Sequence, residues 1–200
     1  MGTSKSIIYD GTFNGFLTLI YQTFDNNWSI SNIQKNTKAS TELFSNTVYL
    51  KTDIALAKKV WFGINKRNHK AIKRIYYAFL SEQNQVEMVL FRYISYLMGK
   101  HLDGFELKTA TENLDLLTAK VEKEKRRMEA FTQFQLTKER GETAHVSPRF
   151  NVLPLLSKHL RMSNKGREWQ VFDDRRRYGI RYSTSGLELI SNTTQVLAAV

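Results

Sequence analysis

The spacing of apolar residues changes near residue 131 of this 200-residue chain, and the change limits the folds that it can adopt. Before that point, apolar side chains recur every three or four residues, the period of a helix with one buried face. After it, they alternate with polar side chains, as in a half-buried strand. Helices followed by hairpins are typical of the α+β class. We therefore expect an N-terminal helical bundle with one long helix packed against a C-terminal antiparallel sheet of hairpins.

This pattern favours a single α+β domain over residues 1–200, with a helical part at about 1–131 and a hairpin part at about 132–192. A short strand is predicted at 7–9, and residues 48–50 are predicted as either a small strand or an extended lead-in to the next helix. A loop containing short pieces of structure is predicted over 25–47. Helices are predicted over 12–24, from Asp53 to an end at Gly63, from just after Asn65 through Phe79, and over 85–98. The longest helix is predicted to begin at Thr109, because Thr109 and Glu112 have the spacing of a capping box.

Glu124 falls on the apolar stripe of that longest helix, which ends with Phe131. We expect it to be at least partly buried, and a buried carboxylate requires a partner. Together with Arg127, one turn further on, a desolvated carboxylate could act as a base or hold a cation. The alternative is a structural ion pair with an arginine of the hairpins, such as Arg149 or Arg176.

The hairpin part has three predicted pieces. Alternation at Phe134 and Leu136, resumed beyond Gly141, predicts a first hairpin, and a short helix is predicted over 153–160. Residues 169–182 predict a second hairpin with a tight, charged turn, followed by a weak strand over 187–190.

At the turn of the second hairpin, Asp173 and Arg176 have the spacing at which an aspartate accepts backbone N–H bonds and an arginine closes an ion pair. Simple turn chemistry is therefore one interpretation of the pair, and an active-site role is the other. Arg175 and Arg177 would project into solvent, where their guanidinium groups match phosphate oxygens.

His145 and His159 are further catalytic candidates. His145 is expected on the strand face opposite Ala144 and Val146, and His159 ends the short helix. Two histidines and a carboxylate could bind a metal if the fold brought them together, but no spacing in the sequence is that of a metal motif. We therefore predict structural histidines and no metal site.

The net charge of +11 is concentrated in two regions. Residues 51–100 contain ten Lys and Arg against three Asp and Glu, and residues 151–200 contain eight against four. Clustered positive charge favours polyanions, because binding releases their counterions. The predicted phosphate contacts in the first region share the outer face of the helix after Asn65, and they are Lys66, Arg67, Lys70, Lys73 and Arg74. A basic surface that merely keeps the protein soluble is the alternative.

The chain contains no cysteine, which excludes disulfides, thiolate zinc sites, iron–sulfur clusters and cysteine nucleophiles within it. We expect no cofactor. No apolar run approaches the ~20 residues of a membrane span, and the N-terminus is too polar for a signal peptide. A cytoplasmic location without a membrane partner is the resulting expectation.

Five segments resemble a bacterial domain-of-unknown-function family described as probable DNA metabolism proteins. Residues 9–17 (Tyr-Asp-Gly-Thr-Phe-Asn-Gly-Phe-Leu) resemble its opening, Y-D-G-x-F-x-G-h-L, where h is apolar, and Thr52-Asp53 with Ala57 and Val60 resembles its second block. Residues 124–134 resemble E-x-x-x-M-x-x-F-x-R-F. Residues 147–159 and 169–182 resemble P-x-x-N-x-x-P-L-h-x-x-H and W-x-h-x-D-x-x-R-x-x-G-x-x-Y. The resemblance covers essentially the whole chain, with departures at Gln133, usually Arg, and Arg126, often His.

The resemblance implies partners and no established reaction. Members of that family are typically encoded beside a radical S-adenosylmethionine protein suspected of DNA modification or repair, and some are fused to a uracil-DNA-glycosylase-like domain. The absence of cysteines fits this division of labour, since an iron–sulfur cluster would lie in the partner.

Three functions remain open from the sequence. The first is an accessory protein of DNA metabolism or repair that binds DNA and works with the radical protein. The second is an enzyme that acts on a nucleobase or phosphodiester, and the third is a protein–protein adaptor without DNA affinity. No catalytic residue is assigned, and the candidates are Glu124, Arg127, Asp173, Arg176, His145 and His159.

Overall fold

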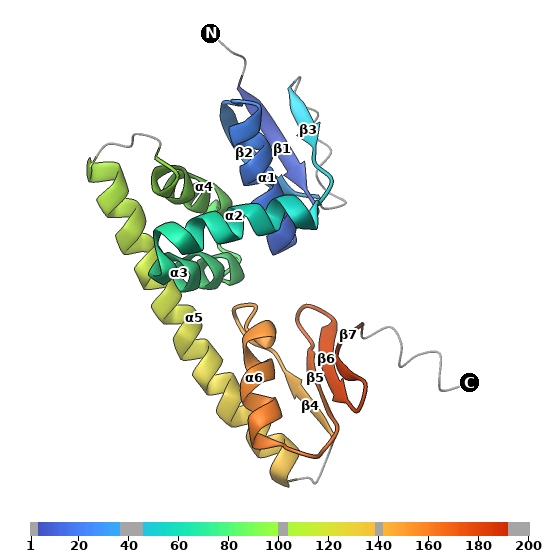
Figure 1. Ribbon diagram of the computed structural model, residues 1–200. Coiled ribbons are helices and arrows are strands. Elements are labelled where there is room, and N and C mark those ends of the chain that lie inside the picture. The colour runs from blue at the N-terminus through green and yellow to red at the C-terminus, as the bar shows by residue number, and fades with distance from the viewer. Residues whose placement is uncertain (1–3, 37–45, 100–103, 139–141, 192–200) are drawn as a thin grey trace. The chain divides into compact units, whose positions relative to one another are not determined.

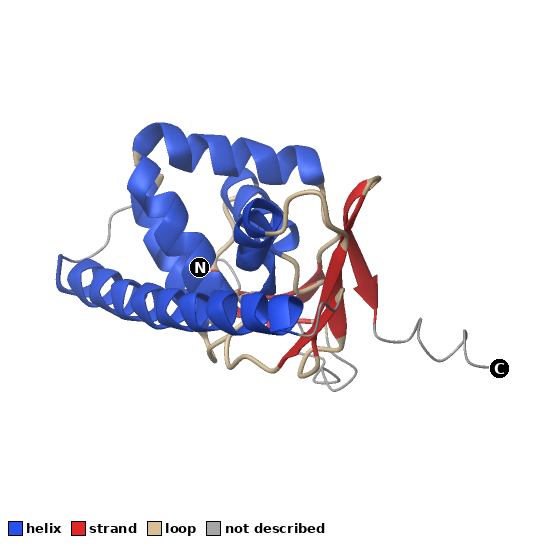
Figure 2. Cartoon of the chain, turned by 90° about the horizontal axis from the view of Figure 1, so that it is seen from below, coloured by secondary structure: helices blue, strands red, loops and turns tan. Residues whose placement is uncertain are grey.

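The computed structural model describes residues 4–36, 46–99, 104–138 and 142–191. They form two compact units, unit 1 (Met1–Thr118) and unit 2 (Ala119–Val200). The described residues form six helices and two sheets, which confirms the α+β class (Figures 1 and 2). The expectation that residues 1–200 are one domain stays a prediction. No helix in the described residues is both long and apolar enough to cross a membrane.

Unit 1 contains a three-stranded parallel sheet in the order β2-β1-β3, formed by β1 (Lys5–Tyr9), β2 (Ile30–Lys35) and β3 (Thr47–Tyr49) (Figure 1). The central strand is almost wholly buried, as a strand covered on both faces must be. The strand predicted at 7–9 is confirmed, and β3 shows that the strand was the correct one of the two alternatives for residues 48–50. Strand β2 lies in the segment for which the sequence predicts only a loop with short pieces of structure.

Four helices lie wholly within unit 1, and all but the last begin at a residue whose side chain caps the helix. They are α1 (Phe13–Asp25), α2 (Ile54–Arg67), α3 (His69–Leu80) and α4 (Val86–Leu97). The hydroxyl of Thr12 accepts from the backbone N–H of Gly15, and the carboxylate of Asp53 accepts from the first turn of α2. These caps satisfy N–H groups that have no partner within the helix, so the helix starts follow from the sequence.

The predicted end of α2 at Gly63 is wrong, because the helix continues through this residue to Arg67. A glycine inside a helix costs only about 1 kcal/mol relative to alanine, and the burial of Val60 and Ile64 on the same face outweighs that cost. Asn68 ends α2 and caps α3. Lys66 and Arg67 therefore belong to the last turn of α2 and not to the face of α3.

Helix α5 (Gly104–Lys138) is longer at both ends than predicted. It begins five residues before Thr109, so the predicted capping box lies inside the helix. It also continues through Phe134 and Leu136, so the first predicted hairpin is not formed. The buried residues Met128, Thr132 and Leu136 recur every four residues and keep this segment helical, whereas Phe131, predicted on the buried stripe, is 46% exposed.

Unit 2 contains a four-stranded sheet in the order β4-β5-β6-β7, formed by β4 (Thr143–Val146), β5 (Trp169–Asp173), β6 (Tyr178–Ser183) and β7 (Gly186–Ser191). Strands β5, β6 and β7 are antiparallel, which confirms the predicted hairpin over 169–182 and the weak strand after it. Strands β4 and β5 are parallel and are joined by α6 (Leu153–Ser163), which packs against β6. A parallel pair needs such a crossover, so β4 could not belong to a hairpin with β5.

Candidate nucleic-acid interface

The hairpin turn between β5 and β6 is held by Asp173, whose side chain is completely buried. One carboxylate oxygen of Asp173 accepts from the backbone N–H of Arg176 at 3.1 Å, and its carbonyl accepts from the N–H of Arg177 at 2.8 Å. Arg177 closes the turn with a positive φ of 57°, which is uncommon for a residue other than glycine. The turn is therefore a fixed structure, with the side chains of Arg175 and Arg177 exposed on it.

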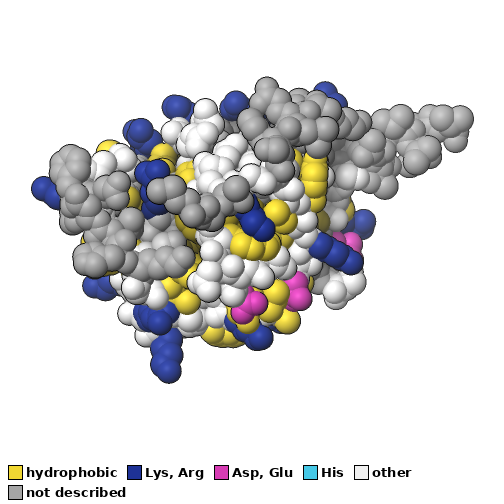
Figure 3. Space-filling model, turned by 90° about the horizontal axis from the view of Figure 1, so that it is seen from above, with side chains coloured by type: hydrophobic (Ala, Val, Ile, Leu, Met, Phe, Trp, Pro, Cys, Tyr) yellow, Lys and Arg dark blue, Asp and Glu magenta, His cyan; other side chains and the backbone are white. Residues whose placement is uncertain are grey.

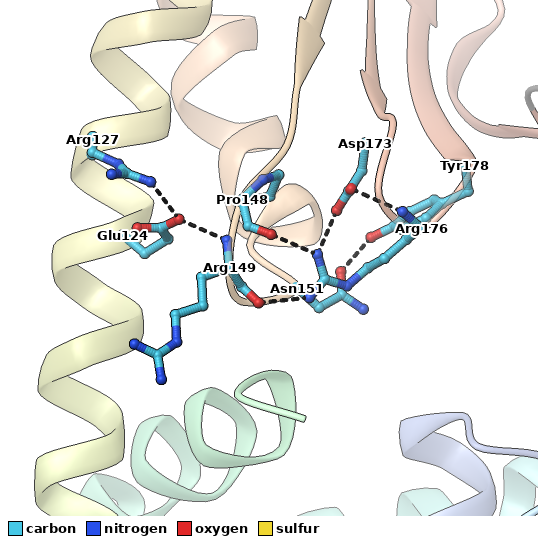
Figure 4. Close-up of polar contacts among 8 residues, drawn as sticks. All are labelled: Glu124, Arg127, Pro148, Arg149, Asn151, Asp173, Arg176 and Tyr178. Atoms are coloured by element: carbon cyan, nitrogen blue, oxygen red, sulfur yellow. Dashed lines mark hydrogen bonds and ion pairs between the residues drawn. The ribbon is translucent and has the colours of Figure 1, made fainter. Parts of the chain in front are cut away.

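Arg176 uses its guanidinium group to join this turn to the loop after β4. Its Nη1 donates to Asp173 Oδ2 at 2.8 Å and to the carbonyl of Pro148 at 3.1 Å, and its Nη2 donates to the carbonyl of Arg149 at 3.0 Å (Figure 4). The side chain of Arg176 is only 13% exposed. A planar guanidinium with donors in fixed directions suits this bridging position.

A second bond joins the same two segments. The hydroxyl of Tyr178, the first residue of β6, donates to Asn151 Oδ1 at 2.5 Å (Figure 4). The loop after β4 is thus connected to the hairpin at its Pro148–Arg149 and Asn151 positions, which restricts the backbone on which the Arg149 side chain is mounted.

Glu124 lies on α5, buried as predicted with 9% exposure. Its Oε1 accepts from Arg127 Nη2 at 2.8 Å and from the backbone N–H of Arg149, also at 2.8 Å (Figure 4). The predicted ion pair with the side chain of Arg149 or Arg176 is not the one observed. Arg127 supplies the charge, while Arg149 contributes only its backbone.

Arg149 therefore keeps its guanidinium outside this network, over the ring of Phe150 at 5.3 Å from the ring centre. Arg149, Arg175 and Arg177 are exposed, and their guanidinium groups form no ion pair with the described residues. The arrangement combines one largely buried arginine that joins two segments with three exposed arginines in the same loop and turn. Such a set can bind phosphate oxygens without first breaking internal bonds.

The two candidate histidines lie in separate, ordinary environments. His145 faces away from Ala144 and Val146, as predicted, with its Nδ1 2.9 Å from Asp174 Oδ1 and its ring stacked on Phe172. His159 lies on α6 with its Nε2 3.4 Å from the hydroxyl of Ser163. Nowhere in the described residues do three or more His, Cys, Asp or Glu side chains gather as a metal site would require.

The basic residues of unit 1 that were predicted to contact phosphates fall into two groups, those with partners within the protein and those that are exposed. Arg74 is held by Asp115, at 2.6 and 3.0 Å, and by the hydroxyl of Tyr93 at 2.7 Å. Burial opposes its charge, but these partners raise the pKa of Arg74 above its ordinary value. Lys73 lies over the ring of Tyr77, and Arg67 donates to the sulfur of Met98. Arg74 is thus largely committed to structure.

Lys66 and Lys70 are exposed, near the end of α2 and the start of α3. Helices α2 and α3 together contain seven Lys and Arg and no Asp or Glu, so the positive charge is not balanced within them. On the face shown in Figure 3, Lys and Arg side chains outnumber those of Asp and Glu. Both units therefore carry basic side chains at which a polyanion could bind.

Two features of the surface were not predicted. From the sequence, Arg149 was considered only as a partner for Glu124. Pro148 and Asn151 flank it and are typical of an exposed loop, which was a signal that the Arg149 side chain lies on the surface. It also does not predict a pocket at Trp61 and Phe62, although adjacent aromatic residues on a basic helix were a signal for one. Trp169 is only 2% exposed and packs on Tyr182 within unit 2, so its ring is not available to a ligand.

Comparison with protein families identifies residues 84–198 as a match to a domain of unknown function, DUF4130. No curated protein and no solved structure matches the chain. The matched segment covers more than half of the chain. It includes α4, the loop after β4 and the hairpin formed by β5 and β6. The protein therefore belongs to the DUF4130 family.

Proposed function

We propose that this protein binds nucleic acid, DNA in particular, as an accessory protein in DNA metabolism or repair. The observation that carries the proposal is the division of labour among the arginines of unit 2. Arg176 is bonded internally to Asp173 and to the loop carbonyls, whereas Arg149, Arg175 and Arg177 are exposed beside it. The guanidinium group of arginine matches the geometry of phosphate oxygens. Because the turn is already fixed in the free protein, less conformational entropy is lost when a ligand binds.

The lysines of unit 1 support the same proposal independently. Lys66 and Lys70 are exposed on helices without acidic residues, so an approaching polyanion meets no compensating negative charge from those helices. Binding of this kind is driven by the release of counterions from the phosphates, and it weakens steeply as salt rises.

The resemblance to probable DNA metabolism proteins supports a narrower form of the proposal. In that form the protein works beside a radical S-adenosylmethionine protein, or a uracil-DNA-glycosylase-like domain, and holds the DNA on which the partner acts. A chain without cysteine would leave any iron–sulfur cluster to the partner.

The geometry supports binding better than catalysis at the candidate carboxylates. Glu124 is nearly sealed from solvent and accepts two hydrogen bonds on one oxygen, and Asp173 is fully buried against Arg176. Both carboxylates therefore stabilise the structure of unit 2. An adaptor without DNA affinity is the outcome to be expected if the binding experiment fails.

The experiment is a titration of labelled single- and double-stranded DNA with the full chain at several salt concentrations. We expect affinity to fall linearly on a log–log plot, and the double variant Arg175→Ala/Arg177→Ala to lower the slope by about 1 for each phosphate that the two arginines neutralise. Arg161→Ala, at an exposed position in the last turn of α6, is a control for charge alone. The proposal would be overturned if the protein bound neither single- nor double-stranded DNA, or if its affinity for both did not depend on salt.

A further inference from the structure

A pocket of about 530 Å³ lies among helices α1, α2 and α3 of unit 1. Its volume is within the range of about 300–1,000 Å³ in which ligand pockets fall. Aromatic rings supply much of its lining, and two polar side chains, Asn14 and Lys58, reach its surface. The aromatic residues are Phe13, Trp61, Phe62 and Tyr76.

Three of the four rings of the aromatic wall, those of Phe13, Trp61 and Tyr76, pack edge to face. The ring of Phe13 lies 5.6 Å from Trp61 and 5.0 Å from Tyr76, with interplanar angles of 89° and 64°. Such contacts stabilise aromatic pairs beyond the area that they bury. Burial, together with the neighbouring Tyr77, raises the pKa of Tyr76, so its hydroxyl remains protonated near neutral pH and can donate a hydrogen bond.

Phe62 differs from the other members of the wall, because 65% of its surface is exposed. An exposed phenyl ring at the edge of a pocket gains little within the folded chain, but it can stack on a flat ligand. Asn14 adds an amide, which offers both donors and an acceptor. The pocket therefore combines flat apolar faces with an amide side chain that can form hydrogen bonds with polar atoms at the edge of a bound ring.

The charge around the pocket narrows the choice of ligand. Lys58 lines it, and α2 and α3 contain no acidic residue. An apolar chain would fill the aromatic wall but gain nothing from the ammonium group of Lys58, which is exposed to solvent. A nucleotide has an aromatic ring for the wall and a phosphate for the lysine.

We propose that this pocket takes one unstacked base of a nucleic-acid strand. The base would stack on Phe62 and Trp61 with its edge at Asn14, and the adjoining phosphate would contact Lys58. The inference rests on the proposed nucleic-acid binding and adds a strand class: a single strand, or a base extruded from a duplex, since a paired base cannot enter a pocket.

The test compares two short single strands of equal phosphate number, oligothymidylate and an abasic strand of the same length. We expect the full chain to bind oligothymidylate roughly tenfold more tightly, the effect of stacking one base on aromatic side chains. Phe62→Ala should reduce this ratio toward one. Phe134→Ala, a change of the same residue type at a position that is 57% exposed on α5, should leave it unaltered.

Each result separates the pocket from the general binding of nucleic acid. Lys58→Ala should weaken both strands about equally and keep the ratio. Equal affinity of the unaltered protein for both strands would overturn the pocket while nucleic-acid binding stands, and so would a preference that survives both Phe62→Ala and Trp61→Ala. Binding to neither strand would overturn the proposed function and this inference with it.

Discussion

Each unit uses one aspartate to join two segments of the chain, but the two aspartates have different partners. Asp173 of unit 2 is completely buried and bonds the guanidinium of Arg176. Asp10 of unit 1 is exposed to solvent and accepts from Thr12, through its hydroxyl and its backbone N–H, and from the hydroxyl of Thr52 at 2.6 Å.

The difference shows how partner chemistry determines what a carboxylate can stabilise. Asp173 lies where an ion is costly unless a charge neutralises it, so it and Arg176 depend on each other. Asp10 keeps much of its hydration and needs only neutral donors, with the positive ends of α1 and α2 nearby. We call the junctions at Asp173 and Asp10 the anchors of unit 2 and unit 1. Loss of Arg176 should strongly destabilise the anchor of unit 2, because it leaves Asp173 buried as an unpaired charge. The stability of the anchor in unit 1 should depend mainly on the room around the Asp10 carboxylate and on pH.

Removal of the arginine from the buried pair should have the largest effect. Arg176→Ala leaves Asp173 buried without its cation and is expected to lower the free energy of unfolding by about 3–5 kcal/mol. Urea unfolding measures the change. The neighbouring variant Arg175→Ala removes the same charge from an exposed side chain, and should change stability by no more than about 0.5 kcal/mol. Equal stability of the two variants would contradict the anchoring role of Arg176.

Crowding should break the anchor in unit 1. A Cβ on Gly15 would lie 2.2 Å from Asp10 Oδ1 and 2.8 Å from Thr52 Oγ1, so Gly15→Ala must displace the carboxylate. We expect a loss of about 1–3 kcal/mol in thermal or urea unfolding.

The matched control for this crowding is Gly63→Ala in α2. Its Cβ would lie no closer than 3.7 Å to Met98, so the better helix propensity of alanine should raise stability by about 0.5–1 kcal/mol. A stabilising effect at both glycines would show that Asp10 does not restrict the start of α1.

Two lysines of unit 1 separate exposed charge from paired charge in binding. Lys66→Ala/Lys70→Ala should lower the slope of log affinity against log salt by about 1.4–1.8, if each lysine neutralises one phosphate. Arg74→Ala removes a charge already paired with Asp115, so a smaller change of slope per charge is expected. A larger change for Arg74 would place the interface on the Asp115 side of α3.

Acid should produce the smallest effect, at Asp10. Burial opposes ionisation, but hydrogen bonds from Thr52 and Thr12 hold the pKa of Asp10 below its ordinary value of 3.8. A carboxyl whose folded pKa is lowered stabilises the fold above its unfolded pKa, and that contribution disappears as pH falls through the folded pKa. The stability difference between the unaltered protein and Asp10→Asn should therefore shrink below about pH 4.

Solvent exposure keeps this difference under about 1 kcal/mol, so unfolding at pH 6 and pH 3 must be compared under identical salt. A difference that grows on acidification would show that Asp10 destabilises the fold in its charged form.

The parts of the fold predicted from the sequence are those determined locally. The helix after Thr12 and the hairpin over 169–182 follow from a cap, a turn and the spacing of apolar residues. The strand predicted at Phe134 and Leu136 was wrong, because alternation over three residues also occurs on a helix whose buried face is at Thr132 and Leu136. The parallel pairing of β4 with β5 depends on a crossover and has no local signature.

The candidate site shows the same limit. The burial of Glu124 was predicted from its place among apolar residues, and it is confirmed. Its second donor was not, because the backbone N–H of Arg149 comes from a loop 25 residues away in the chain. Sequence spacing identifies which side chain is buried more readily than which distant backbone group meets it.

The close approach of Gly15 to Asp10 also has a consequence for how this sequence can change over time. A side chain at position 15 and a carboxylate at position 10 exclude each other in this arrangement, and the hydroxyl at position 52 lies within the same small volume. The three positions, although up to 42 residues apart, should be inherited as a set. Homologues with a larger residue at position 15 are expected to have lost the aspartate as well, so co-variation would reveal this junction in the sequences of relatives.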